Sequence, residues 1–323
     1  GSGNIDDITI SAGATTGTVN FTPTDDSIYD ATSNETATIS INGVSGKTGV
    51  AENSTPQAVT ITITDNESAP TVTITSNSYT MAEDAGGYHT IRAQLSVATY
   101  EDVTVSIDGT GGTATEGTDF GTVSDITITA GNTLGTTTFA TIDDSIYDAT
   151  SNETAGISVS AVSGGGASEN GTQAFTITIT ENESAPTVTL STSGSSIAEN
   201  AGSSLTLTAT LSVATTADVT VGISTSGTGT EGTDYSTISD ITISAGATTG
   251  TASFTPTDDS VYEGNETGIV AISTVSGGSA TEDGTQSVTI TITENESAPT
   301  ITLTTSSSSI LEHTGSSLTL TAT

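Results

Sequence analysis

Residues 59–64 read Val-Thr-Ile-Thr-Ile-Thr, and this strict alternation of apolar and polar side chains recurs at residues 175–180 and 288–293. Successive side chains of a β-strand point to opposite faces, so the apolar residues share one face and the Thr residues share the other. Each stretch therefore predicts a strand that is buried on one face only.

Shorter alternating stretches surround these strands, at residues 103–107, 125–129 and 205–208. Turns rich in Gly, Asp and Asn separate them, and no stretch has the apolar spacing of an amphipathic helix. We expect about seven short strands per repeat, which is the number in an Ig-like sandwich. The fold prediction is all-β, with tandem antiparallel β-sandwich domains.

The chain is built from internal repeats. The sequence Asn-Glu-Ser-Ala-Pro ends at Pro70, Pro186 and Pro299, so the spacing is 116 and then 113 residues. Three longer stretches occur twice without change: residues 25–37 and 143–155, residues 8–18 and 241–251, and residues 203–210 and 316–323. A period of this length indicates whole domains rather than solenoid turns. We expect four segments of a longer array, joined end to end: part-repeat 1–69, complete repeats 70–185 and 186–298, and part-repeat 299–323.

The charge balance is strongly negative and excludes several classes of function. The 323 residues include 38 Asp and Glu against 2 Lys and Arg, which gives a net charge of -36. A chain this acidic cannot neutralise phosphates, so we expect no nucleic-acid partner. No apolar run has the roughly 20 residues of a membrane-spanning helix. The chain has no Cys and therefore no disulfide framework, thiolate metal site or Cys nucleophile.

The acidic residues gather at a few loops that recur from repeat to repeat. In each complete repeat they occupy four positions. One lies after the first pair of strands, and one is the last residue of the turn Thr-Glu-Gly-Thr-Asp. The others lie after the strand that contains Phe and after the last strand. We take these as candidate metal ligands: Glu83, Asp119, Asp143, Asp144, Asp148, Glu153, Glu181 and Glu183; Glu199, Asp234, Asp258, Asp259, Glu263, Glu266, Glu294 and Glu296; and Asp25, Asp26, Asp30 and Asp65.

Four of these motifs, in order, carry a resemblance to a known family. They are Ala-Glu-Asn-Ala-Gly at residues 198–202, Thr-Glu-Gly-Thr-Asp-Tyr at 230–235, Asp-Asp-Ser-Val-Tyr-Glu-Gly-Asn-Glu at 258–266, and Ile-Thr-Glu-Asn-Glu at 292–296. In this order and spacing the chain resembles the Calx-beta domain family, and the resemblance covers both complete repeats and both part-repeats.

The resemblance implies a seven-stranded sandwich with a calcium cluster at one pole. The ligands that it implies are Glu199, Asp234, Asp258, Asp259, Glu263 and Glu294, and in the preceding repeat Glu83, Asp119, Asp143, Asp144, Asp148 and Glu181. Two features depart from the family pattern. Residues 148–153 form a longer loop than the family has, and the closing motif carries Glu-Asn-Glu in place of a run of Asp.

The residues themselves also point to a cation. Hard divalent cations bind six to eight oxygen ligands, mostly carboxylate and carbonyl, and Ca²⁺ accepts more protein ligands than Mg²⁺ does. Carboxylates within a few ångströms repel one another unless a proton or a cation intervenes. Lys47 and Arg92, the only Lys and Arg residues, cannot serve four clusters. We expect bound Ca²⁺, with plainly solvated acidic loops as the alternative.

The position of the clusters adds a mechanical expectation. Glu83 should lie at the pole far from the entry of its repeat, and Glu181 and Glu183 lead straight into Pro186. The cluster would then sit at the junction with the next repeat.

Aromatic residues recur at fixed places, namely Phe21, Phe139, Phe254, Tyr29, Tyr147 and Tyr262, and we interpret all six as core residues.

The function predicted from these observations is structural. We expect a stalk or filament segment of a large secreted adhesin, stiffened by Ca²⁺ and located at the cell surface, for attachment, biofilm formation or gliding. Its partners would be neighbouring repeats of the same chain, with self-association into a fibre as a further option. The alternatives are an array of carbohydrate- or protein-binding modules, and calcium-sensing domains. We do not expect an enzyme, because paired carboxylates of glycoside hydrolases need a cleft, usually with aromatic platforms, and the chain has no Trp.

Overall fold

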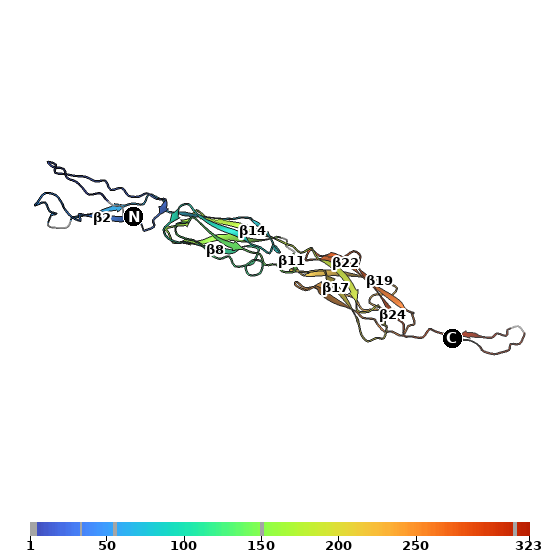
Figure 1. Ribbon diagram of the computed structural model, residues 1–323. Coiled ribbons are helices and arrows are strands. Elements are labelled where there is room, and N and C mark those ends of the chain that lie inside the picture. The colour runs from blue at the N-terminus through green and yellow to red at the C-terminus, as the bar shows by residue number, and fades with distance from the viewer. Residues whose placement is uncertain (1–4, 33, 54–56, 149–151, 313–314) are drawn as a thin grey trace. The chain divides into compact units, whose positions relative to one another are not determined.

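The computed structural model describes residues 5–32, 34–53, 57–148, 152–312 and 315–323. Contacts divide the chain into two compact units: unit 1 comprises Gly1–Asp144 and Asn152–Glu181, and unit 2 comprises Ser145–Ser151 and Asn182–Thr323. Strands and loops make up the described part of both units (Figure 1). Within that part, no helix has the length and apolar character required to cross a membrane.

Unit 1 contains one complete β-sandwich, formed by residues of the second repeat. A four-stranded sheet in the order β10-β6-β4-β13 faces a five-stranded sheet in the order β5-β14-β12-β8-β9. The strands are β4 (Thr71–Ser76), β5 (Thr80–Ala82), β6 (His89–Leu95), β8 (Val103–Gly112), β9 (Ile126–Ile128), β10 (Leu134–Phe139), β12 (Glu153–Ser163), β13 (Ser168–Glu169) and β14 (Ala174–Thr180). Two further strand pairs belong to the unit: the hairpin of β2 (Glu35–Ser40) and β3 (Ala58–Ile63), and the short pair of β1 (Ile28–Tyr29) and β7 (Ala98–Thr99).

Unit 2 repeats this architecture with residues of the third repeat. Its sheets have the orders β21-β17-β15-β23 and β16-β24-β22-β19-β20. The strands are β15 (Thr187–Thr192), β16 (Ser196–Ala198), β17 (Leu205–Leu211), β19 (Val219–Gly227), β20 (Ile241–Ile243), β21 (Thr249–Phe254), β22 (Glu266–Ser276), β23 (Thr281–Glu282) and β24 (Ser287–Thr293). Unit 2 also holds the pair β11 (Ile146–Tyr147) with β18 (Ala214–Thr215), and the hairpin of β25 (Leu303–Thr305) and β26 (Leu320–Ala322).

The all-β sandwich fold predicted from alternation is confirmed. Along β17, Leu207, Ala209 and Leu211 are buried while the intervening Thr residues face outward. Side chains of this kind from both sheets form one core per complete repeat. Each complete repeat has nine strands in its two sheets rather than about seven, because strands of two or three residues are added at the edges.

Two of the edge strands pair in parallel, unlike the rest of the sandwich. β16 pairs with β24, and β23 pairs with β15, and the second repeat has the same two pairings between β5 and β14 and between β13 and β4. The pairing of β16 with β24, and of β5 with β14, matters most for the site described below. It places the end of the second strand of the repeat beside the end of the last strand.

The prediction that the recurring aromatic residues are all core residues is only partly right. Phe139 and Phe254 are fully buried, and Phe254 stacks on Tyr235 with ring centroids 4.7 Å apart. Tyr262, in contrast, is 45% exposed, so the prediction is wrong there. Tyr29 and Tyr147 are half-buried and belong to the short strands β1 and β11 instead of the main sheets. Tyr147 and Tyr262 follow strands β10 and β21, which end at Phe139 and Phe254, so these two Tyr residues lie beyond the interior between the sheets.

Candidate metal centre

One pole of the third repeat is formed where two parallel strands end side by side. Ala198 of β16 lies opposite Thr293 of β24, and the backbone N–H of Glu199 donates to the carbonyl oxygen of Thr293 at 3.0 Å. Because parallel strands end at the same edge of a sheet, Glu199 and Glu294 emerge next to each other. The acidic residues that follow the second strand and the last strand of the repeat are therefore side by side.

The loop between β21 and β22 folds over the same pole. The backbone N–H groups of Glu263 and Gly264 donate to Glu294 Oε2 at 2.7 and 2.8 Å. The backbone N–H of Asp259 donates to Glu199 Oε1 at 3.3 Å. These contacts anchor the acidic loop to the ends of the two strands, so that carboxylates far apart in sequence gather in one place.

The gathered carboxylates form three overlapping groups. In each group one ligand oxygen per residue lies within 4.8 Å of the others, and the groups are Glu199, Glu294 and Glu296; Glu199, Asp259 and Glu263; and Asp234, Glu263 and Glu266. Glu199 and Glu263 each belong to two groups, which links all three. Of the candidates in this repeat, only Asp258 is outside them, although Asn295 Nδ2 donates to its Oδ1 at 3.3 Å.

The turn that carries Asp234 is built by local contacts. Asp234 Oδ2 accepts a hydrogen bond of 2.6 Å from the backbone N–H of Thr230, and the Gly232 N–H donates to the carbonyl oxygen of Tyr235 at 2.7 Å. Tyr235 is buried in the core and so fixes the turn to the sandwich. Gly232 has a φ of +85°, which is unfavourable for residues with a side chain. The second repeat keeps this turn, since Asp119 Oδ2 accepts from the Thr115 N–H at 2.6 Å.

Two carboxylates of the pole have pKa values displaced in opposite directions. Backbone N–H groups of Glu296, Glu263 and Gly264 lower the pKa of Glu294 to about 2, because they stabilise its ionised form. A hydrogen bond with Glu294 raises the pKa of Glu296 to about 7, with burial as the second cause. Glu296 Oε2 is buried and has no hydrogen-bond partner among the described residues. The pole therefore holds one strongly ionised carboxylate beside one that is costly to ionise.

Burial also raises the pKa of three other carboxylates at this pole, those of Glu199, Glu263 and Glu266. In each case the repulsion of neighbouring carboxylates adds to the increase. No Lys or Arg occurs in residues 186–298, so the repeat has no basic side chain to offset this charge. The donor set consists of carboxylate oxygens around a buried acceptor, which fits a hard divalent cation.

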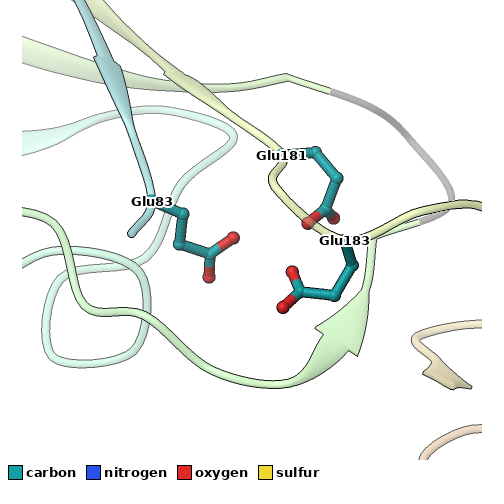
Figure 2. A group of neighbouring side chains, drawn as sticks. All are labelled: Glu83, Glu181 and Glu183. Atoms are coloured by element: carbon teal, nitrogen blue, oxygen red, sulfur yellow. The ribbon is translucent and has the colours of Figure 1, made fainter. Parts of the chain in front are cut away.

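The second repeat has the equivalent glutamates at its own pole. Figure 2 shows Glu83 just after β5, with the carboxylates of Glu181 and Glu183 close to it just after β14, and their ligand oxygens lie within 4.8 Å of one another. The backbone N–H of Glu83 donates to the Thr180 carbonyl oxygen at 3.1 Å, as the N–H of Glu199 does to Thr293. The same strand pairing thus builds the same trio twice.

Other predicted ligands are not brought into a group in the described residues. In the second repeat these are Asp119, Asp143, Asp144, Asp148 and Glu153. Asp148 instead accepts a hydrogen bond of 3.1 Å from the hydroxyl group of Thr216.

The described acidic residues of the first part-repeat line a common hollow, and no such carboxylate group occurs among them. The predicted residues Asp25, Asp26, Asp30 and Asp65 line it together with Glu35, Glu67 and Tyr100. Glu35 and Glu67 also recur from repeat to repeat, as the equivalents of Glu266 and Glu296, although they were not among the candidate ligands.

The fold and the pole define a class: tandem β-sandwich repeats in which the second and last strands end at a carboxylate cluster. The chain belongs to the Calx-beta domain family, whose model matches residues 4–67, 65–183 and 181–296. The resemblance inferred from four motifs is confirmed by these three matches. No curated protein matches the chain at a significant level.

Solved structures with some similarity include a calcium binding domain and bacterial adhesins. The crystal structure of CBD12 from CALX1.2 is 16% identical and has a TM-score of 0.31, with 69% of this chain and 100% of that chain covered. The adhesin InvE of Yersinia pseudotuberculosis is 14% identical with a TM-score of 0.31, covering 68% and 58%. Invasin, a bacterial integrin-binding protein, is 16% identical with a TM-score of 0.31, covering 77% and 45%. The family match, and not these low scores, carries the assignment.

Proposed function

We propose that the complete repeats bind Ca²⁺ at their acidic poles and act as structural segments of an extracellular filament. The observation that carries this proposal is the cluster of Glu199, Glu294 and Glu296, with ligand oxygens within 4.8 Å of one another, and its counterpart in the second repeat. In this proposal the domains are residues 70–185 and 186–298, and residues 1–69 and 299–323 are part-repeats.

A cation relieves the unfavourable charge of the pole. Glu296 has a raised pKa, and its buried Oε2 accepts no hydrogen bond from a described residue, whereas Oε1 accepts one from Asn295 Nδ2 at 3.0 Å. A bound cation supplies a partner for Oε2 and the opposite charge at once. Ca²⁺ suits the site better than Mg²⁺, because Mg²⁺ gives up its water reluctantly and is bound through fewer protein ligands.

The cation would also stiffen the repeat. Glu199 and Glu294 come from two different strand ends, and Asp259 and Glu263 come from the loop that folds over them. An ion shared by these residues crosslinks the loop to both strands. Residues Glu294 and Glu296 lead directly into Pro299, so the crosslink would also restrain the chain where the next repeat starts.

A role as a spacer agrees with the rest of the sequence. Tandem sandwiches provide length, and the high negative charge keeps neighbouring chains apart in solution. We propose a secreted, cell-surface adhesin as the parent molecule, with its repeats serving as the stalk and without catalytic activity. Small-angle scattering of this chain should show a larger radius of gyration and a stiffer chain in Ca²⁺ than in EGTA. An unchanged scattering curve would remove the mechanical part of the proposal.

Calcium binding is tested by isothermal titration calorimetry on the whole chain. We expect saturable Ca²⁺ binding, with the heat reduced by about half in Glu199→Gln and nearly abolished when Glu83→Gln is added. Asp108→Asn is the matched control. It removes one negative charge, as Glu199→Gln does, but Asp108 belongs to none of the carboxylate groups at the poles. If Asp108→Asn and Glu199→Gln weaken binding equally, the effect is nonspecific and the proposed site is wrong.

A further inference from the structure

A dipeptide in the acidic loop of each repeat occurs at three equivalent places: Ile28-Tyr29, Ile146-Tyr147 and Val261-Tyr262. In unit 1, β1 pairs in parallel with β7, setting Ile28 opposite Ala98 and Tyr29 opposite Thr99. In unit 2, β11 pairs in parallel with β18 in the same register, with Ile146 opposite Ala214. The dipeptide of one repeat thus pairs with an Ala-Thr edge of the repeat that follows it in sequence.

Further contacts support both pairings. In unit 1, the Tyr100 hydroxyl group donates to Asp26 Oδ2 at 2.6 Å, and the ring of Tyr29 lies against Gly166, whose Cβ, if present, would be 2.8 Å from Tyr29 Cε1. In unit 2, the backbone N–H of Thr216 donates to the carbonyl oxygen of Tyr147 at 3.2 Å. The Ala-Thr edge and the residue after it therefore recognise the dipeptide and its flanking acids.

The third copy of the dipeptide has no such edge beside it. Val261 and Tyr262 lie outside all strands of the described chain, and they are 57% and 45% exposed. The four residues of the other two copies are half-buried. An exposed Val and Tyr side by side form a small apolar surface in a loop that is otherwise strongly acidic.

The third dipeptide is nevertheless held in the arrangement of a paired copy. Asp259 Oδ1 accepts a hydrogen bond of 2.7 Å from the Val261 N–H, as Asp26 Oδ1 does from the Ile28 N–H at 2.9 Å. After the dipeptide, the Glu263 N–H donates to Glu294 at 2.7 Å; in the first repeat, the equivalent Asp30 N–H donates to the equivalent Asp65 at 3.1 Å. Both flanks are fixed before any pairing forms, which lowers the entropy cost of docking.

We propose that Val261-Tyr262 is a docking strand for the Ala-Thr edge of a fourth repeat. Val261 would lie opposite Ala and Tyr262 opposite Thr, in the parallel register of the two existing pairs. The occupant follows from the sequence: residues 316–323 are identical to residues 203–210, which directly precede Leu211 and the edge Ala214–Thr215. Two residue pairs give weak affinity alone, so the docking depends on the tether between repeats, which raises the effective concentration.

Disulfide trapping tests the pairing, since the chain has no cysteine. The chain is extended by a copy of residues 211–298, a sequence that folds in this protein, and carries Val261→Cys with Cys at the appended copy of Ala214. The positive control is Ile146→Cys with Ala214→Cys, a pair that is opposite in the structure. The negative control moves the appended Cys to the copy of Thr220, outside the edge. Under mild oxidation we expect the test pair to crosslink within one chain, to an extent similar to the positive control.

A second measurement needs no substitution. Nitration by tetranitromethane, followed by mass spectrometry, reports the exposure of each Tyr side chain. In the 323-residue chain, Tyr262 should be nitrated several-fold faster than Tyr29 and Tyr147, and in the extended chain it should become as slow as they are. Crosslinking no greater than in the negative control, crosslinks between chains only, or equal nitration of Tyr262 in both chains would each overturn the proposal. Both measurements are made in EGTA, because Asp259 and Glu294, which hold the flanks of the dipeptide, are also proposed calcium ligands. Their outcome is then separate from the test of the metal site.

Discussion

Residues 8–18 and 241–251 have the same sequence but different structures. In the third repeat, Ile241 and Ile243 belong to β20 and are fully buried. In the first part-repeat, Ile8 and Ile10 are in no strand and are 57% and 58% exposed. The turn that follows is nevertheless the same, since Ala14 N donates to Ser11 O and Ala247 N donates to Ser244 O, both at 2.9 Å. Local sequence thus determines the turn, whereas the strand requires partners from distant parts of the repeat.

The largest effect should come from truncating the core where it is complete. Phe254→Ala removes a fully buried ring that stacks on Tyr235, and we predict a loss of about 3–5 kcal/mol in the stability of the third repeat. Phe21→Ala changes the equivalent residue in the first part-repeat, where Phe21 is only half-buried, and should cost less than about 1 kcal/mol. Urea unfolding followed by circular dichroism measures both. Similar losses in the two variants would contradict the contrast between complete and part-repeats.

An intermediate effect is expected from pH, through Glu296. Its pKa is about 7 in the folded protein and near 4.5 in a free side chain, so its protonated form favours folding. Without metal, this contribution is complete below about pH 4.5 and is lost as the pH rises through about 7. Glu296→Gln should flatten this part of the stability profile in EGTA, as measured by thermal unfolding between pH 5 and 8.

The first part-repeat offers the matched variant for this prediction. Glu67 is equivalent to Glu296, and its pKa is also raised, chiefly by a hydrogen bond with Asp65. The acid-Asn-Glu motif alone therefore produces part of the effect, as the shared turn does in residues 8–18. We expect Glu67→Gln to change the profile less, because the shift of Glu296 is large and includes repulsion from Glu199. A wild-type profile that does not decline between pH 5 and 8 would contradict the pKa assigned to Glu296.

The sequence alone predicted the features that depend on short-range patterns. Alternation at residues 288–293 predicted β24, and the four motifs identified the family. The acidic pole was also accessible, since Glu199 and Glu294 directly follow strands that were recognisable as such. The role of the Tyr in each dipeptide was not accessible. A Tyr with apolar neighbours looks like a core residue in a single repeat, and only the pairing of Tyr29 with Thr99 of the next repeat shows otherwise.

The smallest effect is expected from Tyr100, which distinguishes the contact of the first dipeptide from that of the second. The Tyr100 hydroxyl group is the main cause that lowers the pKa of Asp26, whereas the equivalent Thr216 donates to Asp148 through a shorter side chain. Tyr100→Phe should therefore raise the pKa of Asp26 toward its ordinary value, which an NMR titration of the carboxyl carbon measures. Asp30 is the internal control, because its pKa is lowered mainly by Thr32 and should not move.

The sign of the stability change follows from the direction of that shift. A carboxyl group with a lowered pKa stabilises the folded state above its unfolded pKa, and the contribution disappears as the pH falls. The loss of stability caused by Tyr100→Phe should thus be visible at pH 7 and vanish near pH 2. It should remain well below the loss of stability caused by Phe254→Ala, because the contact of Tyr100 with Asp26 is exposed. If Tyr100→Phe left the pKa of Asp26 unchanged, the hydroxyl group would not hold the dipeptide through this acid. The contact would then rest on backbone pairing with Ala98 and Thr99 and on the packing of Tyr29 against Gly166.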